Sequence, residues 1–178
     1  MTLLYHLQAF EKFRPDTLYL IIFHADKKPP HIGLVWNLRY FSLTTKGFEV
    51  DLPVEEKLLI VEKRKIPCLI IELKATVHDS NNATNLLKIF KSYGPLKPND
   101  TCIAPITEYL ESIYKVKLTG VLLHGLISEL QKHALIERNY ALHLLFSKTN
   151  TYELPQYDKS QITMRINRLI LLDNKKLT

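Results

Sequence analysis

The sequence predicts an α+β fold in which an antiparallel sheet packs against helices. Short aromatic and β-branched stretches dominate the first part of the chain, segments with helical periodicity follow, and strand-like stretches return near the end. A protein built from βαβ units would alternate the two kinds of segment. The 178 residues are 46% apolar and 24% charged, with no repeat and no Gly/Ser linker, so we expect one domain over residues 1–178.

The N-terminal segment, residues 3–13, has helical periodicity. Its apolar side chains fall on one stripe of a helix and comprise Leu3, Leu4, Leu7 and Phe10. Pro15 follows the segment, and proline commonly stands just beyond a helix end. The pattern predicts a short amphipathic helix.

Three strands are predicted next. Residues 18–23 are aromatic and β-branched, and the polar, proline-rich stretch after them is typical of a turn. Residues 31–36 alternate in the manner of a strand, and a turn at residues 37–39 leads to a further strand at residues 40–44. The last two strands form a predicted hairpin.

The middle of the chain adds to this sheet. Residues 48–50 are a short strand candidate, residues 54–63 have a helical pattern after Pro53, and residues 68–73 return as an apolar strand. The expected sheet therefore has four or five strands.

The second half is mainly helical in pattern. Residues 82–93, 104–114 and 121–136 are predicted helices because apolar side chains recur on one face. Residues 140–146 and 161–172 are apolar enough to be strands or a further helix, and the pattern does not decide between the two.

The net charge of +6 and the pI near 9.2 invite a nucleic-acid interpretation. Positive charge gathers in residues 159–176, where one acid, Asp173, faces five bases: Lys159, Arg165, Arg168, Lys175 and Lys176. A solvated basic tail explains this run more simply than a phosphate-binding surface. Nucleic-acid binding is therefore the less favoured alternative.

The two cysteines fit no disulfide framework and no zinc site, because Cys68 and Cys102 form no CxxC or Cys/His pair. Cys68 lies in an apolar strand and is read as a core residue. Nucleotide-binding and metalloprotease motifs are also lacking, so neither a cofactor nor a metal is expected. No apolar run has the length of a membrane span and no signal-peptide pattern opens the chain, so we expect a cytoplasmic protein.

Cys102 is the candidate nucleophile. Asp100 or Thr101 is suited to cap a helix whose first turn contains Pro105, which would place Cys102 at or just inside the helix N-terminus. Backbone N–H groups and the helix dipole at such a position stabilise a thiolate. The same N–H groups can hold an oxyanion during acyl transfer.

A nucleophilic cysteine needs an imidazole to take its proton. His31 is the favoured candidate because it begins a strand and is followed by Gly33, whose missing side chain permits close approach of another element or a substrate. The other histidines considered are His24, His78 and His124, which have no such companion.

This order of elements resembles the circularly permuted branch of the NlpC-type, papain-like cysteine hydrolases, in which the histidine precedes the cysteine. The resemblance covers about residues 16–115. It rests on an apolar strand, a His-x-Gly strand, a Gly-apolar stretch, a strand ending in a base, and a cysteine before a helix. The matching segments are residues 18–23, 31–35, 47–50, 68–74 and 99–103.

The resemblance implies a papain-like fold with Cys102 as nucleophile and His31 as general base. It also implies a third polar residue on the strand after the histidine, which orients the ring. Ser42 occupies that position, with Thr44 as the alternative. A histidine, asparagine or acid is more usual there, and Ile103, Ala104 and Pro105 replace the small or polar residues that often follow the cysteine.

Two functions are consistent with these residues. The first is a cysteine hydrolase or acyltransferase that acts on the amide, peptide or ester of a small molecule, peptide or acyl group. The second is a papain-like module that binds or interacts without turnover. Ser42 favours it, because a hydroxyl holds the imidazole less firmly than the residues usual at that position.

Overall fold

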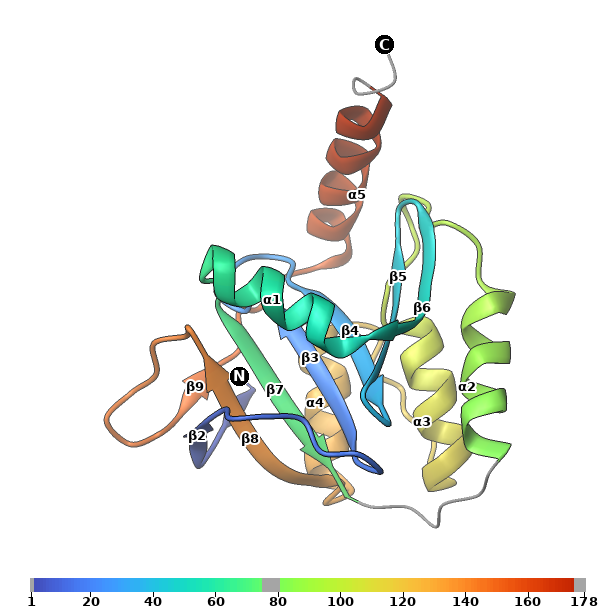
Figure 1. Cartoon of the computed structure of the whole chain (residues 1–178). Helices are drawn as coiled ribbons and strands as arrows, with labels where there is room; N and C mark the ends of the chain where they lie inside the picture. Colours follow the sequence, from blue (N-terminus) through green and yellow to red (C-terminus); the bar gives the residue numbers. More distant parts are fainter. Residues whose placement is uncertain (1, 75–80, 175–178) are drawn as a thin grey trace.

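The computed structural model describes residues 2–74 and 81–174 and has a seven-stranded sheet at its centre (Figure 1). The order across the sheet is β2-β8-β7-β3-β4-β5-β6, and every neighbouring pair is antiparallel except β2 and β8. These strands are β2 (Leu7–Ala9), β3 (Leu18–Phe23), β4 (His31–Trp36), β5 (Arg39–Thr44), β6 (Gly47–Pro53), β7 (Cys68–Leu73) and β8 (Ile136–Leu142). A separate antiparallel pair joins β1 (Leu3–Leu4) to β9 (Tyr152–Glu153).

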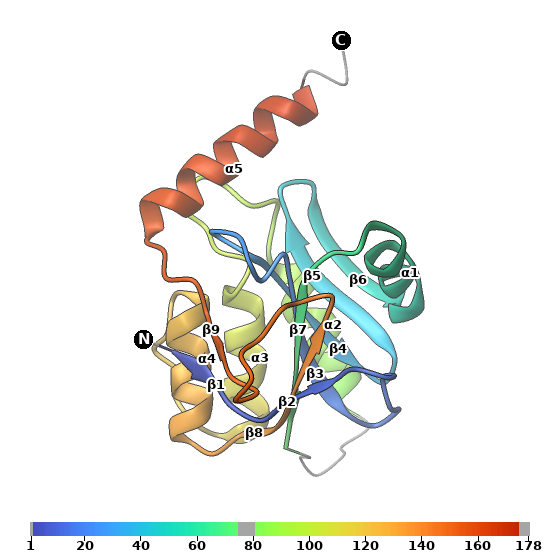
Figure 2. The same cartoon turned by 90° about the vertical axis from the view of Figure 1, so that its left-hand side faces the viewer.

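Helices cover both faces of the sheet. They are α1 (Val54–Arg64), α2 (Asn81–Ser92), α3 (Ala104–Tyr114), α4 (Leu123–Lys132) and α5 (Lys159–Asn174). Figure 2 shows α1 on one side of the sheet and α3 and α4 on the other. The α5 helix projects from the body beyond the β4 and β5 strands in both views. The α+β prediction agrees with this mixed, mostly antiparallel architecture.

Strand β3 shows why the sheet lies between two layers. All six of its side chains are buried, and their alternation sends them to opposite faces. Leu20 and Ile22 belong to the large core shared with α2, α3 and α4, whereas Tyr19 and Ile21 belong to the smaller core under α1. Burial on both faces explains why this strand is continuously apolar in sequence.

The predicted hairpin of residues 31–44 is confirmed as β4 and β5. Asn37 and Leu38 have φ values of 46° and 60°, the left-handed backbone that a two-residue hairpin turn requires. The β5 strand then pairs with β6 through an irregular register between Tyr40 and Ser42. This irregularity lies beside the residues that contact His31.

The expected N-terminal helix is wrong. Residues 3–13 instead contain β1 and β2, which His6, in left-handed conformation with a φ of 54°, separates. Each short strand pairs with a distant one, β1 with β9 and β2 with β8. Pairing with residues more than 130 positions away therefore overrides the local helical periodicity.

The expected four or five strands undercount the sheet, because β2 and β8 extend it to seven. The two undecided segments also resolve differently from each other. Residues 140–142 end β8, which starts earlier at Ile136, and residues 161–172 lie within α5. The helix expected over residues 121–136 is the shorter α4, because β8 takes the last of these residues.

Candidate functional site

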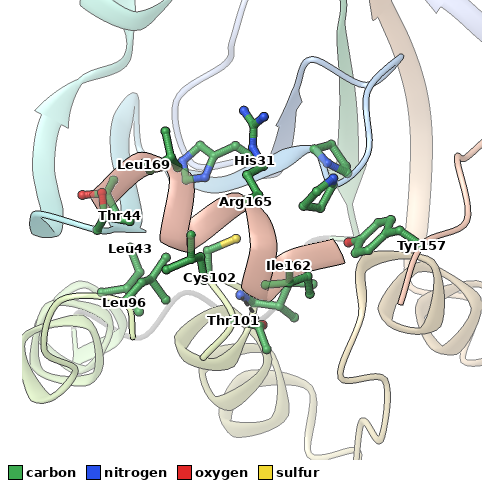
Figure 3. A pocket seen from close by; sticks show the side chains of 15 residues that line it. His31, Leu43, Thr44, Leu96, Thr101, Cys102, Tyr157, Ile162, Arg165 and Leu169 are labelled. Carbon is green, nitrogen blue, oxygen red and sulfur yellow. Dashed lines mark hydrogen bonds between the residues drawn. The ribbon is translucent and has the colours of Figure 1, made fainter. Parts of the chain in front are cut away.

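A cavity of about 240 Å³ opens where the start of β4, the end of β5, the turn before α3 and the helix α5 meet (Figure 3). Both His31 and Cys102 line it. Most of its wall is apolar, and this part includes Leu43, Leu96, Ile162, Ile166 and Leu169. The fold thus brings the candidate nucleophile and the candidate base to one cavity from distant parts of the chain.

Neighbouring side chains fix His31, the first residue of β4, in place. Its ring stacks on Phe23 of β3, with centroids 6.0 Å apart and an interplanar angle of 23°. Its Nε2 atom lies 2.9 Å from the hydroxyl of Ser42 and 3.4 Å from that of Tyr40. Ser42 thus engages Nε2, whereas no hydrogen bond joins Nδ1 to another of the described residues.

Burial controls the charge of His31. Loss of water lowers the pKa of the imidazole to about 4, and the positive charges of Lys57 and Arg165 act in the same direction, while Glu49 opposes them. The ring is therefore neutral near pH 7. A neutral imidazole can accept a proton, as general-base chemistry requires.

Cys102 lies in a turn, two residues before the first residue of α3. The expectation that it opens the helix under an Asp100 or Thr101 cap is wrong, because Ile103 is the N-cap and no side chain caps the helix. The Thr101 hydroxyl accepts the Ile103 N–H, and the Asp100 carboxylate accepts the N–H of Lys97. Both polar side chains therefore stabilise the preceding turn, and Pro105 is in the first helical turn as expected.

The thiol of Cys102 is partly buried and forms no disulfide. Burial raises its pKa, although backbone hydrogen bonds with Ile32 and with Cys102 itself act against this rise. Burial thus favours the neutral thiol, in contrast to the thiolate expected at a helix N-terminus. The contact with Ile32 places the sulfur against the residue that follows His31.

The structure does not join the two groups directly. Within residues 2–74 and 81–174, no hydrogen bond links the Cys102 sulfur to the His31 ring. Alternation along β4 explains this, because Ile32 faces the core under α2, α3 and α4, while His31 contacts Phe23 and Tyr40 on the other face. The two residues therefore approach one cavity from opposite sides of one strand.

Gly33 has a packing role. A Cβ atom at this position would lie 2.3 Å from Cε2 of Tyr40, so the Tyr40 ring occupies the space that a side chain would need. The close approach expected at Gly33 is thus made by a neighbouring strand. Thr44, the alternative partner for the histidine, donates instead to the backbone carbonyl of Gly47.

Among the described residues, His31 is the one histidine that lines the cavity with Cys102. His24 is in the turn after β3, His124 is in α4 against Tyr157, and His78 lies outside the described residues. Cys68 is fully buried in β7, as expected for a core residue. Burial raises the pKa of the Cys68 thiol to about 12.

Sequence reasoning missed two residues of the cavity, Tyr157 and Arg165. The Tyr157 hydroxyl accepts the backbone N–H of Leu123 at 3.2 Å, and Figure 3 shows this hydroxyl and the Cys102 sulfur pointing toward each other. No sequence motif identifies Tyr157 as part of a site. Arg165 belongs to the basic run that was interpreted as a solvated tail, whereas it is partly buried in the cavity wall.

In the part of the chain that the structure describes, His, Cys, Asp and Glu side chains form no group of three that could hold a metal ion. None of the helices there combines the length and apolar character needed to cross a membrane. Comparison with protein-family models, curated proteins and solved structures finds no match to this chain.

Proposed function

We propose that this chain is a papain-like cysteine hydrolase or acyltransferase of the permuted NlpC type that acts on an amide, peptide or ester. The observation that carries the proposal is the shared cavity. Cys102 and His31 both line it, and the Cys102 sulfur contacts the backbone of Ile32, next to His31 in the chain. A thiol and a neutral imidazole at one cavity are the two groups that acyl transfer to sulfur needs.

In this proposal the Cys102 sulfur attacks the substrate carbonyl carbon while its proton passes to Nδ1 of His31. The tetrahedral intermediate collapses when the bond to the leaving group breaks and the leaving group takes that proton. Water, or an acceptor alcohol or amine, then attacks the thioester, gives a proton to His31 and releases Cys102 as a thiol. Each proton that His31 accepts is returned within the cycle.

No hydrogen bond joins the imidazole and the thiol at rest, so in this proposal the proton passes between them only when substrate occupies the cavity. Catalytic hydrogen bonds commonly tighten only in the substrate complex. The raised pKa of Cys102 and the lowered pKa of His31 indicate that both groups rest in neutral form. Proton transfer then accompanies attack on the carbonyl, and no resting ion pair is involved.

Two further groups fit roles in this scheme. For Nδ1 to act as the base, Nε2 must keep its proton and donate it to the Ser42 hydroxyl. The Tyr157 hydroxyl already accepts the Leu123 N–H, so its own proton is available to an oxyanion in the cavity. We assign the Cys102 backbone N–H as the second oxyanion donor.

The test is acylation of the intact chain by p-nitrophenyl octanoate, followed by intact mass and peptide mapping. We expect one octanoyl group on Cys102, none in Cys102→Ala, and a rate about 10²- to 10⁴-fold lower in His31→Gln. Tyr157→Phe should slow the reaction without removing the adduct. Cys68→Ser is the matched thiol control and should acylate normally, because Cys68 is buried away from the cavity.

Acylation that survives in Cys102→Ala, or that is as slow as in free cysteine, would overturn this proposal. The second candidate would then hold, namely a binding module that uses the same cavity without turnover. The observation that favours it is the missing contact between Cys102 and His31. It predicts that eight-carbon ligands bind the cavity while the thiol stays unmodified.

A further inference from the structure

Arg165 is the feature of the cavity that the proposed chemistry leaves unused. It is the sole lysine or arginine among the described residues that line the cavity, and it stands in a mainly apolar wall. Its side chain extends from α5 beside the His31 ring (Figure 3). Its charge acts on both His31 and His24.

Three of the other arginines have acidic partners, whereas Arg64 and Arg168 have none among the described residues and are exposed. Arg14 and Arg138 pair with Glu72, and Arg39 pairs with Asp51. The nearest acid on its own helix, Asp173, pairs with Lys46. Within the described residues, Arg165 has neither an ion pair nor a hydrogen bond.

A partly buried guanidinium without a partner is a poor arrangement for the folded chain alone. The residue has lost part of its hydration, and no acceptor among the described residues pairs with its five N–H donors. The planar fork of donors matches the oxygens of a carboxylate or phosphate. An anion in the cavity would supply those acceptors.

The rest of the wall sets the shape of the accompanying group. Leu43 and Leu96 offer methyl groups from the body, and Ile162, Ile166 and Leu169 offer them from α5. Such a lining favours an apolar chain and gives a peptide few hydrogen-bond partners. One ligand type satisfies both parts of the cavity, namely an apolar chain that carries a single anionic group.

We propose that Arg165 is a specificity-determining residue that binds the carboxylate or phosphate of an amphiphilic ligand whose apolar chain lies in the cavity beside Cys102. The helix α5 then supplies both the apolar wall and the anion contact. The statement that this ligand is a substrate rests on the proposed function, whereas the binding itself does not.

The experiment measures binding to the intact chain by calorimetry with octanoate, octyl phosphate and octanol below their micelle concentrations. None of these is an acylating agent, so turnover does not enter. We expect at least one of the two anions to bind about 10- to 100-fold more tightly than octanol, as for hydrogen bonds to charged groups. The tighter of the two anions identifies the carboxylate or the phosphate as the natural group.

Arg165→Gln should reduce the affinity for the anion to that for octanol and leave octanol binding unchanged. Arg168→Gln is the matched control, because Arg168 lies on the same helix and is exposed. Arg165→Lys keeps the charge without the fork and should fall between wild type and Arg165→Gln. Melting temperatures of all variants check that the fold is kept.

Equal binding of octanol and both anions would overturn the inference, and so would an equal loss in Arg165→Gln and Arg168→Gln. The two proposals can fail separately. Selective anion binding without acylation of Cys102 would remove the catalytic function and keep the anion site. Acylation of Cys102 without any effect of Arg165→Gln on binding would keep the catalytic function and remove the anion site.

Discussion

At the scale of single residues, the contact between His31 and Ser42 sets the orientation of the imidazole ring. Ser42 is fully buried, and its hydroxyl lies 2.9 Å from Nε2. Phe23 holds the ring from one side, and Tyr40 adds a second, longer contact at 3.4 Å. A hydroxyl in this position fixes the ring without adding a charge.

We expect Ser42→Ala to lower the rate of Cys102 acylation by about tenfold, the equivalent of one neutral hydrogen bond. Octanoate affinity should stay unchanged, because Ser42 positions His31 and does not line the cavity. Stopped-flow acylation and calorimetry separate the two effects. Ser112→Ala serves as control, because it removes a hydroxyl that donates to the Tyr109 carbonyl and accepts from Asn85 of α2. An equal loss of rate there would contradict the assignment.

The residue pattern identifies part of this site and omits the rest. His31 and Ser42 stand at fixed positions in a strand pair, so a hairpin prediction is enough to bring them together. Tyr157 and Arg165 come from segments whose path over the cavity depends on tertiary packing. The charge of Arg165 is visible in the sequence, but the direction in which its helix presents it is not.

At the scale of elements, the segments from β3 to β7 are predictable because their neighbours in the sheet are close in sequence or because they are buried on both faces. The short strands β1 and β2 are not, since each has at most three residues and a partner near the other end of the chain. Residues 161–172 were ambiguous for another reason. The α5 helix buries only one stripe, and Met164 and Leu171 are exposed on it, which blurs the helical period.

The end of α1 offers a test of local backbone strain. Lys65 caps this helix with left-handed φ and ψ of 50° and 46°, a conformation that costs an L-residue energy and that glycine adopts freely. We expect Lys65→Gly to raise the free energy of unfolding by about 0.5–1 kcal/mol in urea titrations. Lys63→Gly, inside the same helix, should lower it by about 1 kcal/mol. A loss of stability in both variants would count against the strained cap.

At the scale of the whole molecule, contacts between distant segments close the fold. The β1 and β2 strands pair with β9 and β8, and Glu72 of β7 binds Arg14 and the Tyr140 hydroxyl. Glu72 is 4% exposed, so these partners supply the hydrogen bonds that water cannot reach. The sheet that these contacts stabilise also carries the cavity residues His31 and Leu43.

The buried His31 makes this stability depend on pH. Its folded pKa of about 4 lies below the unfolded value, so the unfolded chain binds more protons between pH 6.5 and 4. Stability should therefore fall as the pH drops through this window, by at most about 3 kcal/mol. Urea unfolding at pH 7.5, 5.5 and 4.5 measures it. His31→Gln should flatten the curve, and His133→Gln, at the exposed C-cap of α4, is the control variant.

The α5 wall of the cavity has a consequence for biosynthesis. A ribosome releases His31 and Cys102 well before residues 162–169, so the growing chain contains the thiol and the imidazole before the helix that forms one wall of the cavity. Any chain cut short before this point would carry both side chains but would lack the α5 wall and the Arg165 guanidinium. The cavity is therefore complete only after most of the chain has left the ribosome.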